Sequence, residues 1–188
     1  MDIIKVFKEC NALLEGHFIL SSGLHSNKYL QCAKVLQYPD IASIIGEEIA
    51  ENFATTQVDV IVGPAMGGVI IAQEVGRALS TKTIFSEREN GKMTFRRGFE
   101  VKPGEKAIVV EDVITTGGSA KEVAEMLESR GVEVIAVASI IDRSNGTADF
   151  GVPFHSLAKV EVETYKPEEC PMCESGDEAV KPGSRGLK

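Results

Sequence analysis

Two carboxylates precede a segment rich in glycine and hydroxyl side chains in the run 109–120, which reads VVEDVITTGGSA. Glu111 and Asp112 come first, and threonines, glycines and a serine follow two residues later. Glycines let the backbone turn tightly enough to point successive N–H groups inward, hydroxyls add donors, and the N-terminus of a following helix adds partial positive charge. The sequence therefore predicts a site for a phosphate monoester, held by Thr115, Thr116, Gly117, Gly118 and Ser119.

The two acids must serve another part of the same ligand, because carboxylates repel phosphate. Sugar hydroxyls and a magnesium ion are the partners that we expect for them. A P-loop ATPase is excluded, since that loop places a lysine directly after its last glycine, whereas Ser119 and Ala120 follow Gly118 here.

Three other segments carry groups that could bind a ligand. The turn 63–68, GPAMGG, could present N–H groups to a second phosphate cluster or could be only a tight connection. The segment 92–98, KMTFRRG, has three cations and no acid, which is typical of a solvated hairpin or of a flap that closes over a departing pyrophosphate. Arg143 follows a long apolar run, and its planar guanidinium suits either bidentate capture of a carboxylate or a surface position.

The elements that must position these groups alternate between strand and helix. From residue 58 onward this alternation predicts an α/β fold, with a central, mainly parallel sheet, helices on both faces, and ligands at the carboxyl ends of the strands. The expected strands are 17–22, 29–34, 58–62, 83–85, 107–110 and 132–141, and the expected helices are 2–15, 39–53, 69–79 and 119–130.

The length of the chain, 188 residues, suits one domain, or at most one domain with a small appendage. Residues 1–35 lie outside the alternation of strands and helices, so we expect them to form a small N-terminal hood over the site. Residues 36–160 form the expected core. Residues 161–188 are polar and acidic, so we expect a C-terminal tail that ends loosely.

Composition excludes several classes of partner. The net charge of -8 and the 6% aromatic content, without tryptophan, argue against nucleic-acid binding and against anionic membranes. No apolar run is long enough to span a membrane, and the start of the chain, Met-Asp-Ile-Ile-Lys, lacks a secretory signal. With only four cysteines, a reducing cytoplasm is the expected compartment.

Cys170 and Cys173 have the spacing of metal ligands, but zinc normally takes four. A second pair would have to come from another subunit or from the distant His155, Cys10 or Cys32. We therefore expect a reduced or incidental pair rather than a metal site.

The order of apolar strand, two acids and Thr-Thr-Gly-Gly-Ser resembles the phosphoribosyl pyrophosphate motif of the type I phosphoribosyltransferases. Phe18–Leu30, FILSSGLHSNKYL, is similar to the N-terminal segment that closes over the base in the orotate phosphoribosyltransferase family, and the resemblance covers most of 18–146. It implies a type I phosphoribosyltransferase-like fold that transfers phosphoribose to orotate. It also implies a homodimer whose flap lysine, Lys92, serves the site of the neighbouring subunit.

The resemblance further implies roles for single residues. Asp112 and Lys92 would be catalytic, and Thr115 and Arg143 would contact orotate. Mg²⁺ would be the cofactor, bound mainly through substrate oxygens and water rather than by protein ligands. The residues that would bind phosphoribosyl pyrophosphate are Arg88, Lys92, Arg96, Glu111, Asp112, Val113, Ile114, Thr115, Thr116, Gly117, Gly118 and Ser119.

Two alternatives stay open on the sequence. The acceptor could be another base, such as uracil, xanthine or hypoxanthine, because a phosphoribose site does not choose the acceptor. The protein could also be a non-catalytic sensor of phosphoribosyl pyrophosphate. Such a regulator would usually carry a DNA-binding element, and neither end of the chain has a basic helix or a helix-turn-helix pattern.

Overall fold

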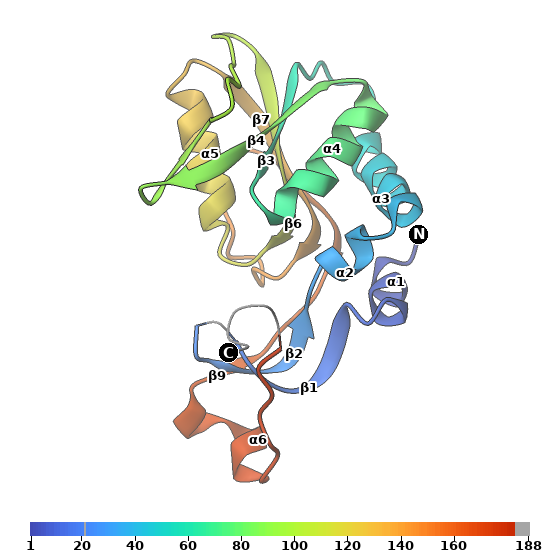
Figure 1. Ribbon diagram of the computed structural model, residues 1–188, viewed down its shortest axis with the longest axis vertical. Coiled ribbons are helices and arrows are strands. Elements are labelled where there is room, and N and C mark those ends of the chain that lie inside the picture. Colours follow the sequence, from blue (N-terminus) through green and yellow to red (C-terminus); the bar gives the residue numbers. More distant parts are fainter. Residues whose placement is uncertain (21, 183–188) are drawn as a thin grey trace. The chain divides into compact units, whose positions relative to one another are not determined.

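The structure is a computed structural model that describes residues 1–20 and 22–182 (Figure 1). The chain divides into two compact units. One comprises Met1–Val35 and the chain from Glu161 onward, and the other comprises Leu36–Val160. Each unit has its own sheet.

The larger unit contains a six-stranded sheet with the order β5-β4-β3-β6-β7-β8. All neighbouring strands are parallel except β5, which is antiparallel to β4 at the edge. This confirms the predicted, mainly parallel α/β sheet. Its strands are β3 Val60–Pro64, β4 Lys82–Glu89, β5 Lys92–Thr94, β6 Lys106–Ile114, β7 Glu133–Asp142 and β8 Phe154–Lys159.

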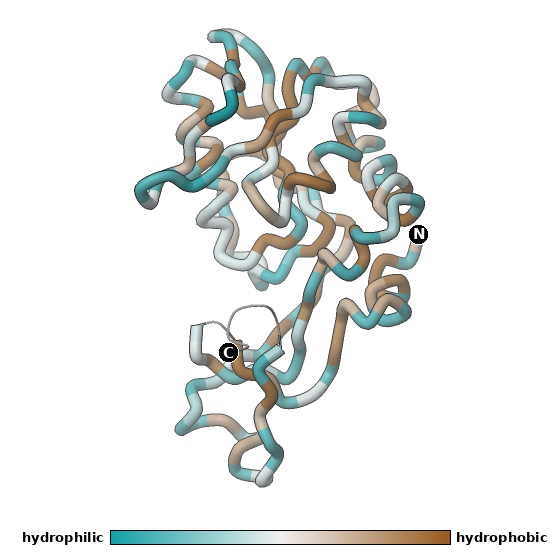
Figure 2. The backbone as a smooth tube through the Cα atoms, in the orientation of Figure 1, coloured by the Kyte–Doolittle hydropathy of each residue, from teal (hydrophilic) through white to brown (hydrophobic). Residues whose placement is uncertain are grey.

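Helices cover both faces of this sheet, as predicted (Figure 1). The helices α3 (Pro39–Glu51) and α4 (Gly67–Leu79) pack together on one face, and α5 (Gly118–Glu128) packs on the other. A strand between two helical layers must be apolar on both sides, and every residue of β3 is buried. Figure 2 shows the hydrophobic colour in the central strands and hydrophilic colour at the tip of the β4–β5 hairpin.

The smaller unit contains the helix α1 and an antiparallel sheet with the order β1-β2-β9. Asp2 caps α1 by accepting a hydrogen bond from the Lys5 N–H at 3.0 Å. The short helix α2, Ala33–Leu36, follows β2. The other elements of this unit are α1 Ile3–Glu9, β1 Leu13–Ile19, β2 His25–Leu30, β9 Thr164–Tyr165, the 3₁₀ helix η1 Pro167–Glu169 and α6 Pro171–Glu174.

The predicted helix 2–15 is too long. The helix α1 ends at Glu9, because Asn11 adopts a left-handed conformation with φ of 51° that turns the chain into β1. Gly16 does not end a helix as expected. It lies inside β1, where the pairing with β2 shifts by a β-bulge between Glu15 and Phe18.

The expected hairpin 17–34 is present, but its strands are displaced toward the N-terminus. The strand β1 begins at Leu13 rather than His17, β2 covers His25–Leu30, and residues 33–36 are helical rather than extended. Of the predicted strand 17–22, Ser21 lies outside the described residues. The displacement arises because the alternation of side chains along this segment is interrupted by the bulge.

Residues 161–182 contain short elements of secondary structure, and the expected loose end of the tail lies outside the described residues. The short elements are β9, η1 and α6, and β9 pairs with β2 through His25 and Ser26. A strand of two residues and a helix of four are too short to give a periodic pattern, so the sequence could not reveal them. The edge strand β8, parallel to β7, was also missed. Among the described residues, no helix is long and apolar enough to cross a membrane.

Candidate functional site

The acid pair lies near the carboxyl end of β6, within the strand rather than after it as the sequence suggested. Both side chains are half-buried. The Val113 N–H donates to Asp112 Oδ1 at 2.9 Å, which holds the carboxylate against its own backbone. The strand continues to Ile114, which pairs with Asp142 at the end of β7. The acids therefore sit at the edge of the sheet where parallel α/β folds bind ligands.

The glycine-rich turn 63–68 packs directly against the acid pair. A Cβ on Gly67 would lie 2.5 Å from Asp112 Oδ1, and a Cβ on Gly68 would lie 2.8 Å from the Val110 carbonyl oxygen. Only glycine allows this approach, so the first turn of α4 contacts the carboxylate of Asp112. The structure thus joins two motifs that are separate in the sequence.

The Thr-Thr-Gly-Gly-Ser segment, residues 115–119 and called the phosphate turn below, connects β6 to α5. Gly117 is the N-cap of α5 in a left-handed conformation, with φ of 77°, and a Cβ there would lie 2.9 Å from the ring of Phe150. Thr115, Thr116 and Gly118 are exposed, so a ligand can reach them. The turn therefore presents hydroxyls and N–H groups at a helix N-terminus, the arrangement that favours phosphate.

The carboxyl of Glu111 has a strongly raised pKa. Burial, and to a smaller extent the negative charge of the neighbouring Asp112, raise the pKa from the ordinary 4.5 to about 7. One proton can therefore reside on the acid pair near neutral pH. A hydroxyl donor or a cation that approached this pair would favour the ionised form and would release that proton.

Arg143 lies at the same edge of the sheet as the acid pair. Its N–H donates to the Ile114 carbonyl oxygen at 2.7 Å, so its backbone is beside the residue that precedes Thr115. The buried carboxylate of Asp142 accepts hydrogen bonds from the N–H of Ser144 at 2.8 Å and from its hydroxyl at 2.7 Å, which fixes the turn that carries Arg143. The sequence singled out Arg143 but assigned no task to Asp142.

The cationic segment forms a β-hairpin of β4 and β5. Its turn, Asn90-Gly91, has positive φ at both residues, as a two-residue hairpin of this kind requires. Arg88 donates to both carboxylate oxygens of Glu122 on α5, at 2.7 and 3.3 Å, and Glu122 also accepts from the Met93 N–H at 2.7 Å. These bonds lower the pKa of Glu122, the Met93 N–H having the largest effect.

The other cations of the hairpin are exposed. Arg96 is 3.6 Å from Glu89, and Lys92 forms no ion pair with any residue in the described ranges 1–20 and 22–182. The structure therefore brings together the acid pair, the phosphate turn, turn 63–68 and Arg143. It shows no contact of Arg88, Lys92 or Arg96 with them within those ranges.

Glu122 was missed by the sequence reasoning. It lies on the helix that follows the phosphate turn, where an isolated acid is typical of a solvated face, so no local signal distinguished it. Only the pairing of β4 with β5 brings Arg88 and the Met93 N–H to it.

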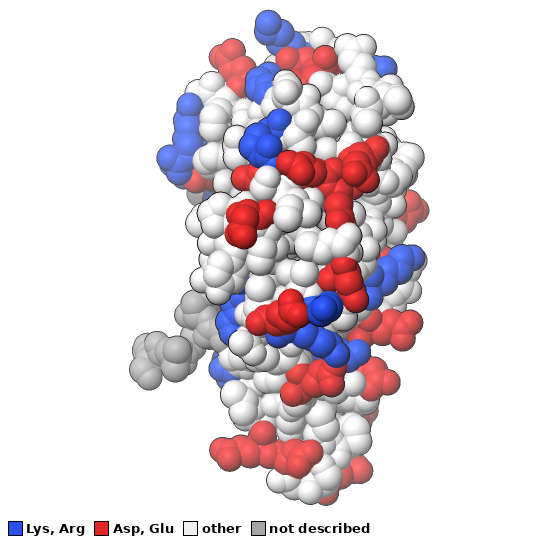
Figure 3. All heavy atoms as spheres, turned by 90° about the vertical axis from the view of Figure 1, so that its right-hand side faces the viewer, with Lys and Arg blue, Asp and Glu red and all other residues white. Residues whose placement is uncertain are grey.

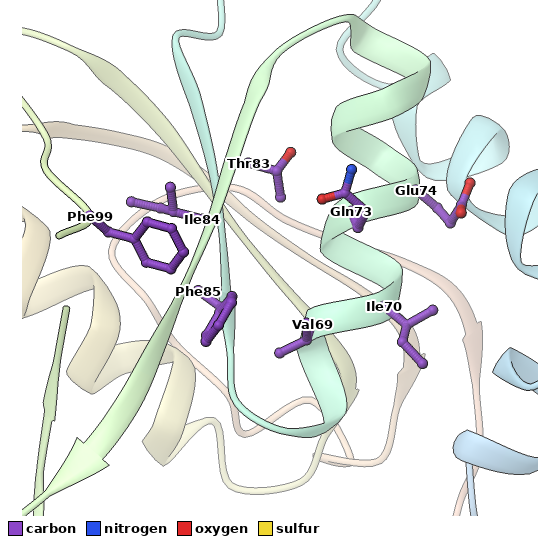
Figure 4. Close-up of a pocket in the computed structure, with 8 residues that line it drawn as sticks. All are labelled: Val69, Ile70, Gln73, Glu74, Thr83, Ile84, Phe85 and Phe99. Carbon is purple, nitrogen blue, oxygen red and sulfur yellow. The ribbon is translucent and has the colours of Figure 1, made fainter. Parts of the chain in front are cut away.

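A separate pocket of about 340 Å³ lies between α4 and β4 (Figure 4). None of the predicted site residues lines it. The rings of Phe85 and Phe99 meet edge to face at 5.1 Å beside it. Its lining is mostly apolar and comprises Val69, Ile70, Gln73, Glu74, Thr83, Ile84, Phe85 and Phe99.

On the face drawn in Figure 3, acidic and basic side chains are interspersed, and lysine and arginine do not gather into one continuous patch. This agrees with the negative net charge. Because the net charge is negative, we expect attraction for an anionic ligand to come from local groups, such as the phosphate turn and the hairpin cations.

Comparison with known proteins decides the family. The model of the phosphoribosyl transferase domain matches residues 33–151. The chain belongs to the phosphoribosyltransferase family. This phosphoribosyltransferase is 56% identical over 186 residues to a protein of Thermotoga petrophila named orotate phosphoribosyltransferase, covering 99% of this chain and 100% of the relative. A protein of the same name from Carboxydothermus hydrogenoformans is 57% identical, with 98% of both chains covered.

Solved structures agree with this family and confirm the predicted type I phosphoribosyltransferase-like fold. The orotate phosphoribosyltransferase of Aeropyrum pernix matches with a TM-score of 0.69 and 27% identity, over 84% of this chain and 93% of that one. The adenine phosphoribosyltransferase of Rhodothermus marinus has a TM-score of 0.65 and 19% identity, over 84% and 99%. The fold alone therefore does not select the base.

The phosphate turn should tolerate alanine at Gly118 but not at Gly117. We expect Gly117→Ala to lower the free energy of unfolding by about 2 kcal/mol or more, because a left-handed conformation costs other residues about 1–2 kcal/mol and the new Cβ would also strike Phe150. Gly118→Ala is the matched control, since its Cβ would lie 3.6 Å from the nearest side chain. Urea unfolding measures both, and equal stabilities would contradict the geometry.

The raised pKa of Glu111 predicts a pH-dependent stability. The pKa is about 7 in the folded chain and 4.5 in the unfolded chain. Between these two pH values the folded state therefore binds more protons than the unfolded state. The free energy of unfolding therefore falls as pH rises through this window, by at most about 3 kcal/mol, and the contribution is constant above it.

Glu111→Gln removes this titration. We expect the variant to gain stability relative to the parent chain as pH rises from about 4.5 to about 7. Unfolding in urea at several pH values measures the difference. Glu100→Gln, an exposed change before the start of β6, should give curves parallel to the parent, and a parallel Glu111→Gln curve would show that burial does not shift this group.

Proposed function

We propose that this phosphoribosyltransferase acts on orotate, transferring the phosphoribosyl group from 5-phosphoribosyl 1-pyrophosphate to N1 of orotate in UMP biosynthesis. The products are orotidine 5'-phosphate and pyrophosphate. The observation that carries the proposal is the 56–57% identity, over nearly the whole chain, with proteins named orotate phosphoribosyltransferase. The geometry of the site supports it.

The phosphate turn and the acid pair bind different parts of the phosphoribosyl group. Residues 115–119 hold the 5-phosphate with N–H groups and hydroxyls, and Val113 and Ile114 lead the backbone into this turn. Glu111 and Asp112 accept hydrogen bonds from the ribose hydroxyls. Breaking the bond between C1 and the pyrophosphate oxygen develops positive charge on the ribose, and the carboxylate of Asp112 stabilises it there.

Magnesium fits this arrangement as an ion carried mainly by substrate. The acid pair offers two carboxylates, and the one group of three or more possible metal ligands in the described residues lies elsewhere, around His17. Mg²⁺ usually binds through one or two carboxylates, water and substrate phosphates, and it would supply neutralising charge to the pyrophosphate. Glu111 and Asp112 would hold its water ligands or the ribose oxygens beside it.

Arg143 and Thr115 orient the base. Orotate carries a carboxylate, which the guanidinium of Arg143 can bind in bidentate fashion at the strand edge where Thr115 begins the phosphate turn. The N1 of orotate is then directed at C1 of the ribose. N1 of orotate carries a hydrogen, and this proton must leave as the bond from N1 to C1 forms. Water or the oxygens of the departing pyrophosphate can accept it.

The hairpin cations receive the leaving pyrophosphate. Lys92 is exposed and without an ion pair in the described ranges, so it is available for this task in a neighbouring subunit. Arg88 must leave Glu122 to reach the pyrophosphate, and Arg96 must leave Glu89. Exposed ion pairs contribute only about 0–1 kcal/mol, so a polyphosphate can replace them.

The proposed assembly is a homodimer in the cytoplasm, with a hairpin from each subunit over the site of the other. Exposed apolar side chains on or beside α3 and α4 support such an association. These are Ile44, Met66 and Ile70, and Ile70 also lines the pocket between α4 and β4.

The choice of acceptor is tested with a panel of bases. With magnesium and phosphoribosyl pyrophosphate, we expect orotate to be consumed, and adenine, hypoxanthine and uracil to be consumed far more slowly. Arg143→Ala should raise the KM for orotate by about 10- to 150-fold, because a charged hydrogen bond contributes about 1.5–3 kcal/mol, while the KM for phosphoribosyl pyrophosphate changes little.

Lys82→Ala is the control for this experiment, because it removes a cation at the amino end of β4, where Lys82 pairs with Glu105 at 3.2 Å. It should leave both KM values unchanged. Faster turnover of a purine than of orotate would overturn the assignment of the base. Equal weakening of both substrates by Arg143→Ala would overturn the role of that residue alone.

The shared hairpin is tested by mixing two inactive variants, Lys92→Ala and Asp112→Asn. Each should lose on the order of 100-fold or more in turnover, since each removes an aligned electrostatic contact. If Lys92 acts across the interface, one site in each mixed dimer holds both native residues, and activity returns after subunit exchange. Fluorescence transfer between labelled subunits verifies the exchange, and exchange without recovered activity would refute the shared site.

A further inference from the structure

Four metal-ligating side chains meet in the smaller unit, remote in sequence from the transferase motifs. They are His17, His25, Cys170 and Cys173, and their ligand atoms all lie within 4.8 Å of one another. His17, His25 and Cys170 are buried, whereas Cys173 is exposed. Nothing in the proposed transfer reaction uses these groups.

The fold brings both histidines to one side of the β1–β2 hairpin. A regular strand would point His17 and Phe18 to opposite faces, but the bulge in β1 lets both be buried. On the neighbouring strand, His25 pairs with Ile19. The two imidazole rings lie edge to face with centroids 4.8 Å apart.

The C-terminal segment supplies the two cysteines from a tight turn. Cys170 is the N-cap of α6, and its carbonyl oxygen accepts from the Cys173 N–H at 3.0 Å. This turn places both thiols against the histidines. Cys170 Sγ is 3.5 Å from His17 Nε2, and Cys173 Sγ is 3.7 Å from the same atom and 3.2 Å from His25 Nδ1.

These separations match the edges of a tetrahedron around zinc. Bond lengths of about 2.0–2.1 Å to nitrogen and 2.3 Å to sulfur place a nitrogen and a sulfur ligand about 3.6 Å apart. The three measured nitrogen–sulfur distances, 3.2 to 3.7 Å, bracket this value. The nitrogens of His17 and His25 are 2.8 Å apart, so the rings need to separate by only about 0.5 Å.

His17 already has the outer partner that a metal-bound histidine requires. Its Nδ1 lies 2.9 Å from the Asp177 carbonyl oxygen, which can only accept, so Nδ1 carries the proton. In the neutral ring Nε2 then carries the lone pair, and Nε2 is the atom that faces the cysteines and, at 2.8 Å, Nδ1 of His25. Metal-bound histidines commonly donate their other N–H to a backbone carbonyl in this way.

We propose that His17, His25, Cys170 and Cys173 form a structural Zn²⁺ site of the Cys₂His₂ type. His17 binds through Nε2 and His25 through Nδ1, and both cysteines bind as thiolates, releasing their protons on metal binding. Two sulfur and two nitrogen ligands in a tetrahedron favour zinc over the hard cations, which prefer oxygen. All four positions are filled by protein, as in a structural rather than a catalytic site.

The site would tie the chain from Glu161 onward to the N-terminal hairpin. The other ties between them include the pairing of β9 with β2 and the hydrogen bonds of Val180 to His17 and Ile19, at 2.9 and 2.8 Å. Hydrogen bonds from Ser26, Asn27 and Lys28 to Glu161 and Glu163 also join them. A unit of this size buries a small core, and small domains commonly need a metal or disulfides to be stable.

The experiment uses the full chain, reduced, stripped of metal with a chelator and titrated with Co²⁺. We expect one Co²⁺ per chain, visible absorption bands of tetrahedral cobalt, a thiolate charge-transfer band, and displacement of both by one Zn²⁺. Cys173→Ser should lower metal affinity by more than about 100-fold, since loss of an outer partner alone costs about 10–100-fold. Cys10→Ser is the matched control, because Cys10 lies in the same unit outside the cluster.

A second measurement does not depend on any variant. Zinc should protect the bonds between residues 161 and 182 of the parent chain from proteolysis, and a chelator should remove the protection. The proposal is wrong if the folded, reduced parent chain binds neither Co²⁺ nor Zn²⁺, or if Cys173→Ser binds cobalt as the parent does. A disulfide between Cys170 and Cys173 that persists under cytoplasmic reducing conditions would also overturn it.

Discussion

The parallel sheet is the constraint on which the site depends. Because β3, β6 and β7 run in the same direction, the segments that follow them all emerge at one edge. Turn 63–68, the acid pair, the phosphate turn and Arg143 therefore become neighbours although the chain separates them. Turn 63–68 can lie this close to the acid pair only because Gly67 and Gly68 have no side chain. The backbone of the turn therefore sets the distance between the acids and α4.

The charges around the site explain how a protein with a negative net charge can bind an anionic ligand. At neutral pH the half-buried acid pair can keep one proton, because the pKa of Glu111 is about 7, so its repulsion of phosphate is partly relieved. Arg88 and Arg96 are held meanwhile in weak, exposed pairs with Glu122 and Glu89. A polyphosphate with magnesium would reverse both conditions, drawing the cations from their partners and the proton from the acids.

The sequence predicted the parts that are local. The acids and the phosphate turn are contiguous, and the buried strands from residue 58 are apolar runs, so the core fold and the position of this site followed directly. The predictions failed where distant segments decide the structure. The bulge at Gly16 moved β1, and β9 pairs with β2, more than a hundred residues earlier. Glu122 could not be recognised without the hairpin that binds it.

The cysteine pair is the clearest example of a site that the sequence alone could not identify. Spacing alone identified Cys170 and Cys173 as possible ligands, but the candidates considered for the other two positions did not include the histidines that the structure supplies. His155, one of those candidates, belongs to the larger unit, where its ring packs on Phe53. A polar segment buries too little apolar surface to be ordered by the hydrophobic effect, so directional bonds must order it. Coordination by four ligands from both ends of the chain is the strongest bond of that kind that these side chains can form.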